Sequence, residues 1–250
     1  MVAGFEGFKS WFKGYEDQFV IIGGAACDIL MTEEGASFRG TRDIDMVLMI
    51  ESLTADFGRR FWEYVKAGGY QHRNKSSGEP QFYRFTNPES LEYPLMLELF
   101  SRRLEAIELP PDAVLTPLPL DDDLSSLSAI LMDDDYYNFL RAVKILIDGM
   151  PILDAAYLIP LKAKAWLDLT ARKAAGESVD GRHIRKHKND IFRLEGVLTL
   201  SGRTDSHDSV KADLAAFCSA MQNEDVDVKS MGILRSKAEI LERITRAYFD

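Results

Sequence analysis

The chain has 250 residues, of which 46% are hydrophobic and 28% are charged, the balance of an ordinary folded protein with one large domain or two small ones. Its net charge of -10 gives no overall attraction to nucleic acid, although a local basic patch could still bind it. The two cysteines, Cys27 and Cys218, have no metal-ligand spacing, and no apolar run approaches the length of a membrane span. We therefore expect a cytoplasmic protein with reduced thiols and no membrane partner, and we exclude a disulfide scaffold.

The first hundred residues alternate between helical and strand patterns. Aromatic residues at helical spacing predict a short amphipathic helix over 5–13. The β-branched run 19–22 predicts a buried strand that stops at Gly23-Gly24, with a helix opening over 25–31. The pattern also predicts a helix over 55–67 and strands over 43–50, 81–85 and 94–100.

The composition changes after about residue 110, where four prolines and an acidic trio lie within 109–124. Beyond this point helical periodicity dominates, over 137–147, 153–172, 184–200, 209–221 and 229–249. The sequence thus predicts an α+β fold in which a mixed sheet with flanking helices (residues 1–120) is followed by a helical domain (121–250).

The most informative motif is an Asp-x-Asp pair, Asp43 and Asp45, on the predicted strand 43–50. Residues two apart in a strand point to the same side, so the two carboxylates converge. A divalent cation between them would relieve their repulsion, and oxygen-only ligands suit Mg²⁺ or Mn²⁺. Glu98 interrupts an apolar strand and is the candidate third ligand, because a buried unpaired acid is costly. A lone Asp-x-Asp is also common on solvated strands.

The glycine pair Gly23-Gly24 has two interpretations. It is a plain strand-to-helix turn, or it lets the backbone approach phosphate oxygens at the N-terminus of a helix. The order Gly-Gly, then Arg-x-Thr-x-Asp-Ile-Asp-Met (39–46), then a single acid in a later strand resembles the nucleotidyltransferase superfamily, the fold of polymerase beta. Within it, the motifs look closest to the bacterial AbiEii-type branch of abortive-infection and toxin–antitoxin systems.

This resemblance implies a nucleotidyltransferase-type mixed sheet and assigns roles to individual residues. Asp43, Asp45 and Glu98 would be the catalytic metal ligands, whereas the nucleotide would be bound by Gly23, Gly24, Arg39 and Thr41. One departure is that Ala25 follows the glycines, so the hydroxyl of the superfamily's usual Gly-Ser is missing.

The densest positive run of the chain, 182–188, lies in the second half. By itself such a run is most simply a solvated helix face. The branch, however, carries a Lys on one helix of its second half and a Lys-Asp motif on the next. Lys162 or Lys164 fits the first, and Lys186 with Asp190 fits the second loosely, which implies contacts with the nucleotide phosphates.

The sequence therefore supports a metal-dependent nucleotidyltransferase that moves an NMP from an NTP to an acceptor hydroxyl on a protein, an RNA or a small molecule. The branch resemblance adds a role in a toxin–antitoxin or abortive-infection system, with a cognate antitoxin as a partner. The alternative is a non-catalytic regulator that keeps the fold and binds a nucleotide or a protein.

Overall fold

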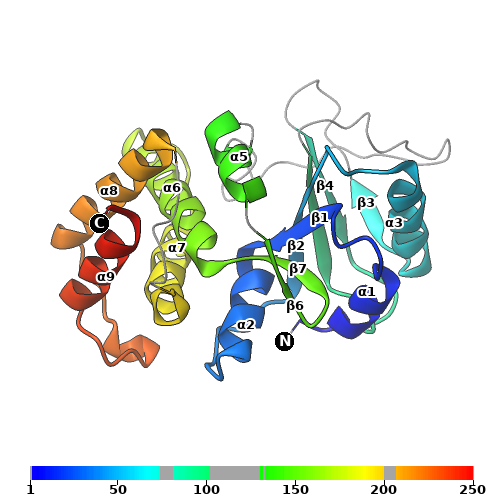
Figure 1. Cartoon of the computed structure of the whole chain (residues 1–250), viewed down its shortest axis with the longest axis horizontal. Helices are drawn as coiled ribbons and strands as arrows, with labels where there is room; N and C mark the ends of the chain where they lie inside the picture. Colours follow the sequence, from blue (N-terminus) through cyan, green and yellow to red (C-terminus); the bar gives the residue numbers. More distant parts are fainter. Residues whose placement is uncertain are drawn as a thin grey trace. The chain divides into compact units, whose positions relative to one another are not determined.

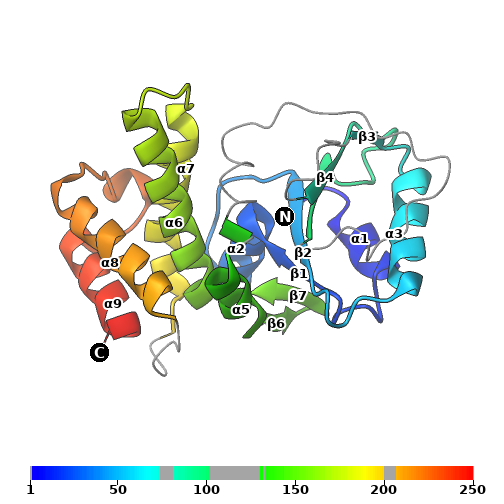
Figure 2. The same cartoon turned by 90° about the horizontal axis from the view of Figure 1, so that it is seen from above.

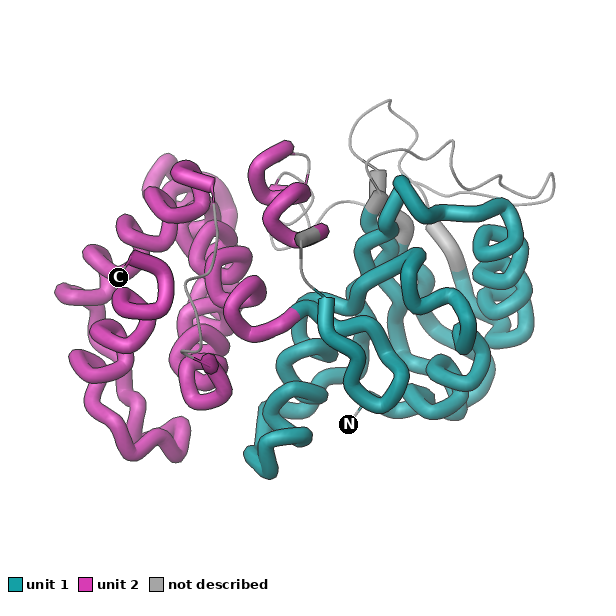
Figure 3. The backbone as a smooth tube through the Cα atoms, viewed as in Figure 1, with its two compact units in different colours: residues 1–119, 144–153 teal, residues 120–143, 154–250 magenta. Residues whose placement is uncertain are grey.

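The computed structural model describes residues 2–73, 81–101, 130–131, 133–142, 144–199 and 207–249. The chain forms two compact units, one of residues 1–119 with 144–153 and the other of residues 120–143 with 154–250 (Figure 3). Among the described residues, no helix has the length and apolar character needed to cross a membrane. The first unit thus contains a later segment, 144–153, that lies past the boundary predicted at residue 120.

A mixed sheet organises the first unit. Its described strands follow the order β3-β4-β5-β2-β1-β7-β6, in which β1 pairs with β7 and β2 with β5 in parallel, and the other neighbours are antiparallel. The strands are β1 (Phe19–Ile22), β2 (Asp43–Leu48), β3 (Gln71–Arg73), β4 (Gln81–Thr86), β5 (Met96–Ser101), β6 (Lys144–Ile147) and β7 (Met150–Leu153). The predicted fold class, an α+β mixed sheet with a helical C-terminal half, is confirmed.

Within the part of the chain that the structure describes, three helices flank this sheet: α1 (Phe5–Trp11), α2 (Gly23–Glu33) and α3 (Ala55–Ala67). Figures 1 and 2 show α1 and α3 together on one side of the strands and α2 on the other. The side of α1 and α3 holds an aromatic core in which Phe12 lies within 6.1 Å, between ring centroids, of Phe8, Phe19, Phe57 and Phe61. Burial of these large rings stabilises this side of the sheet.

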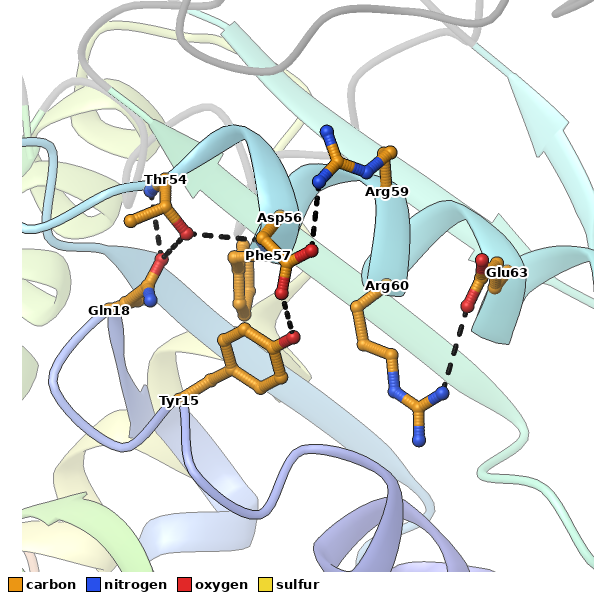
Figure 4. Close-up of polar contacts among 8 residues, drawn as sticks. All are labelled: Tyr15, Gln18, Thr54, Asp56, Phe57, Arg59, Arg60 and Glu63. Atoms are coloured by element: carbon orange, nitrogen blue, oxygen red, sulfur yellow. Dashed lines mark hydrogen bonds and ion pairs between the residues drawn. The ribbon is translucent and has the colours of Figure 1, made fainter.

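The start of α3 shows how local sequence sets an element boundary (Figure 4). The Thr54 hydroxyl caps the helix by accepting a hydrogen bond from the Phe57 amide at 3.2 Å, and it donates to Gln18 Oε1 at 2.9 Å. Tyr15 donates to Asp56 in the first turn. The helix therefore begins at the predicted residue, Ala55.

The segment 144–147, predicted as the end of a helix, is instead the strand β6. It pairs with β7 through a two-residue turn at Asp148 and Gly149, whose φ angles are 49° and 76°. Positive φ at both central residues is the condition for a tight hairpin, and Asp-Gly is a preferred pair there. This hairpin extends the sheet and explains why 144–153 belongs to the first unit.

The second unit is helical in its described part, as predicted. Its helices are α5 (Asp134–Ala142), α6 (Ala155–Ala174), α7 (Gly181–Leu194), α8 (Asp208–Asn223) and α9 (Lys237–Phe249), with short 3₁₀ helices at Glu195–Val197 and Lys229–Met231. Asp154 and Asp180 cap α6 and α7 through their carboxylates. The predicted helix 229–249 is divided, because Gly232 adopts a φ of 76° after the 3₁₀ turn and α9 begins only at Lys237.

Candidate functional site

The sheet register places the predicted acids on one face. Strand β2 pairs in parallel with β5 so that Asp45 lies directly beside Glu98. Strand β2 also pairs with β1. In that pairing Leu48 of β2 lies opposite Phe19, whose ring belongs to the aromatic core. Because successive side chains of a strand alternate between faces, Asp43 and Asp45 project from the face opposite this core. The prediction that Asp43 and Asp45 share a strand and that Glu98 lies on its neighbour is confirmed.

The two glycines leave space for polar side chains of the site. Gly23 has a φ of +66°, and a Cβ atom there would lie 1.8 Å from Asp45 Oδ2. A Cβ atom on Gly24 would lie 2.9 Å from Thr41 Oγ1 and 3.4 Å from Arg39 Nη2. Only glycine combines this left-handed backbone with the close approach of Asp45. The first turn of α2 thus packs against three of the residues that the sequence places near it.

Glu98 is the most buried acid of this site, with 7% of its surface exposed. Its Oε1 accepts from Arg84 Nη2 at 2.6 Å and from Arg84 Nε at 2.7 Å. Burial raises the pKa of Glu98 well above its usual value, and the Asp45 carboxylate, which shares a hydrogen bond with it, raises this pKa further, whereas Arg84 opposes the shift. The Glu98 carboxyl therefore keeps its proton to a higher pH than an ordinary glutamate does.

The chemistry of these donors suits a hard divalent cation, because Asp43, Asp45 and Glu98 offer only carboxylate oxygens. The space beside Gly23, which any Cβ would fill, lets one of these carboxylates approach the backbone at the start of α2. Within the described ranges, however, no three His, Cys, Asp or Glu side chains are gathered closely enough to hold a metal ion. The three acids would have to change their side-chain positions to share one.

The predicted basic residues belong to the second unit. Lys162 Nζ lies 2.9 Å from Asp190 Oδ2, and the two side chains are 5% and 0% exposed. Lys164 Nζ lies 3.0 Å from Asp213 Oδ2, with 37% of the lysine side chain exposed. Lys186 lies on α7 and is half-buried. Two predicted residues, Lys162 and Asp190, are thus brought together as a buried ion pair.

Arg84 is the residue of the carboxylate site that the sequence interpretation missed. It lies on β4 directly opposite Glu98. The other residues of this strand (QFYRFT) are aromatic or polar, and none of them is charged. The available signal was a single arginine in one predicted strand and a single glutamate in the next. Opposite charges on paired strands stabilise each other when the register brings them side by side.

Comparisons with known proteins add little. No family model matches the sequence, and no curated protein matches it. Among solved structures, the chain is similar to the crystal structure of an antigenic nucleotidyltransferase-like protein from Paracoccidioides brasiliensis, with a TM-score of 0.45 and 13% sequence identity over 92% of this chain and 85% of that one. A likeness this distant carries no conclusion about the function of this chain.

Proposed function

We propose that this protein is a metal-dependent nucleotidyltransferase that moves an NMP from an NTP to an acceptor hydroxyl. The acceptor oxygen attacks the α-phosphorus, and the bond to the β-phosphate breaks to release pyrophosphate. The observation that supports the proposal most is the packing of the Asp45 carboxylate against Gly23 at the N-terminus of α2, with Glu98 beside it. A helix N-terminus attracts phosphate, and paired carboxylates attract the cation that accompanies a triphosphate. The two features together favour a nucleoside triphosphate over either an anion or a cation alone.

Each residue of the first unit has a role in this proposal. The amides of Gly23 and Gly24 would donate to phosphate oxygens, because Ile22, at the N-cap of α2, has no side chain that could cap the helix. Arg39 and Thr41, which pack over Gly24, would bind the same phosphates through a guanidinium and a hydroxyl.

The cation would be Mg²⁺ or Mn²⁺, held by Asp43, Asp45 and Glu98. When bound, it would neutralise the triphosphate and lower the pKa of the acceptor hydroxyl. The protein side chains would fix the carboxylate oxygens and keep the reacting groups in line.

The proposal extends to the basic residues of the second unit. Lys162, Lys164, Lys186 and Asp190 would serve nucleotide binding, as the resemblance implies. Lys164 and Lys186 are the stronger members of this set, since their side chains are partly exposed. Lys162 neutralises Asp190 within the unit, which leaves it less charge to offer a phosphate.

The finer parts of the proposal rest on the sequence motifs alone. The acceptor is a hydroxyl of a protein, an RNA or a small molecule, and the resemblance of Gly23-Gly24 and residues 39–46 to the AbiEii-type branch favours a toxin with a cognate antitoxin. The net charge of -10 favours a protein acceptor over extensive contact with RNA.

The test is transfer of label from α-labelled NTPs to macromolecules of a cell extract, with Mg²⁺ or Mn²⁺. Asp45→Asn removes one charge at nearly constant size, and we expect transfer to fall at least about 10²-fold, the scale of losing one preorganised electrostatic group. Asp56→Asn is the matched control, because Asp56 is an exposed carboxylate on α3 that pairs with Arg59. Equal labelling by the wild type and Asp45→Asn would refute catalysis at this site.

The second candidate is a non-catalytic regulator that binds a nucleotide or a partner protein. It is favoured by the ion pair between Arg84 and Glu98, which occupies one oxygen of the third acid, and by the lack of a three-ligand group in the described residues. A thermal shift by NTP with Mg²⁺, without label transfer to any acceptor, would support this candidate. A shift that depends on Asp45 together with transfer would exclude it.

A further inference from the structure

Three charged side chains form a row across the sheet, on the face opposite the aromatic core. Arg84 on β4 is directly opposite Glu98 on β5, and Glu98 is directly beside Asp45 on β2. Arg84 places both Nε and Nη2 within 2.7 Å of the same oxygen, Oε1 of Glu98. A guanidinium that donates twice to one carboxylate is held more firmly than a lysine would be.

Little solvent reaches this ion pair. The side chains of Arg84 and Glu98 are 15% and 10% exposed. If either charge lost its partner, little water could solvate it instead. Glu98 therefore needs a cation nearby whenever it is ionised. Arg84 provides one from within the chain, and a divalent cation at Asp45 would provide another.

The two cations cannot both bind Glu98 closely without repelling each other. A metal ion lies about 2.0–2.6 Å from a carboxylate oxygen, and Arg84 nitrogens already lie at 2.6 and 2.7 Å from Oε1. Two positive groups on one carboxylate, in a site with little water, are poorly screened. A metal ion must therefore either displace the guanidinium from Glu98 or bind despite electrostatic repulsion by the guanidinium.

We propose that Arg84 competes with the divalent cation for Glu98 and thereby sets the affinity of the carboxylate site for metal. Arg84 is a positioning residue, which holds Glu98 in the metal-free protein and releases it when metal binds. This inference rests on the proposed function, because it assumes that Asp45 and Glu98 are metal ligands. It adds a residue of β4 that the sequence motifs do not include.

The experiment measures Mn²⁺ binding directly, from the loss of the electron paramagnetic resonance signal of free Mn²⁺, and melting temperature with and without Mn²⁺. Arg84→Gln removes the competing charge, and we expect Mn²⁺ to bind at least tenfold more tightly. The metal-free variant should melt at a lower temperature than the wild type, because buried Glu98 has lost its partner, whereas saturating Mn²⁺ should restore most of the difference. Arg59→Gln is the control, because it breaks an exposed ion pair with Asp56 and should leave Mn²⁺ affinity unchanged.

Arg84→Lys keeps the proposal testable if Arg84→Gln does not fold. A lysine retains the charge but cannot donate to Glu98 through two nitrogens at once. We therefore expect Mn²⁺ to bind about two- to fivefold more tightly than in the wild type. A merely structural role for Arg84 would lower the melting temperature equally with and without Mn²⁺ and would leave affinity unchanged.

The outcomes separate this inference from the proposed function. If the wild type and Asp45→Asn bind Mn²⁺ equally, there is no metal site at Asp45, and both proposals fail. Mn²⁺ binding could instead depend on Asp45 while the Mn²⁺ affinity of Arg84→Gln stays within a factor of 1.5 (about 0.2 kcal/mol) of the wild type. In that case only the competition by Arg84 is refuted. Where only Arg84→Lys folds, the same limit applies to that variant.

Discussion

The buried ion pair between Lys162 and Asp190 gives the sharpest stability prediction. Lys162→Met keeps most of the apolar stem and removes the ammonium from the side of a carboxylate that has no exposed surface. Arg193 Nη1 lies 3.9 Å from the other oxygen of this carboxylate. Breaking a buried pair from one side costs about 3–5 kcal/mol. We expect a loss near the lower value, because Arg193 compensates in part.

For a unit of this size, such a loss lowers the melting temperature by roughly 10–20 °C. Lys164→Met is the matched control, because its ion pair with Asp213 is partly exposed and should contribute less than about 1 kcal/mol. The assay is thermal unfolding followed by circular dichroism. The double variant Lys162→Met/Asp190→Leu should recover most of the loss, since it removes both buried charges.

The same variant separates a structural role of Lys162 from a role in phosphate binding alone. If Lys162 instead served only to bind phosphate, Lys162→Met would melt like the wild type and lose only the NTP-induced shift. That result would refute the ion-pair reasoning.

Three further predictions concern the glycine turn, a thiol and a helix cap. Gly23→Ala should lower the free energy of unfolding by more than Gly35→Ala. Both glycines have positive φ (+66° and +70°), but a Cβ atom on Gly23 would clash with Asp45, whereas one on Gly35 would meet nothing within 4 Å. Equal losses in chemical denaturation would contradict this reasoning. Burial raises the pKa of the Cys218 thiol to about 11, so in the native protein at pH 8 it should react with Ellman's reagent far more slowly than after unfolding; equal rates would show that it is accessible. Asp154→Ala should cost about 0.5–2 kcal/mol, because its carboxylate caps α6, with Asp154→Asn retaining most of the stability in urea unfolding.

Much of the first unit could be predicted because its signals are local. The strand 19–22 and the helix 55–67 have the predicted bounds, since a β-branched run ends at two glycines in one case and a Thr cap precedes an apolar stripe in the other. The placement of Glu98 on a strand next to that of Asp43 and Asp45 also followed from pattern, because each acid interrupts an apolar strand.

The rest depended on contacts between distant segments or on turn chemistry that helical periodicity concealed. Residues 144–147 continue an apolar pattern from α5, so they look helical until the Asp148-Gly149 turn is recognised. The pairing of β4 with β5 decides that Arg84 faces Glu98, and a one-residue slip would place it on the opposite face. The whole predicted boundary region 109–124 and the segment 200–206 lie outside the described residues.

The charges around the carboxylate site connect its stability to its proposed function. Asp43, Asp45 and Glu98 bring three acids to one face, and Arg84 forms an ion pair with the most buried of them. Stability alone would favour a neutral pair in place of Arg84 and Glu98, since well-packed apolar groups often replace buried ion pairs without loss. A chain that instead gathers acids near the start of a helix, and uses a left-handed glycine to admit one of them, has an arrangement that suits the proposed cation site. The deciding experiment compares the melting temperatures of the wild type and Asp45→Asn with and without Mn²⁺. A cation site at Asp45 predicts that this variant is more stable without metal and no longer responds to Mn²⁺.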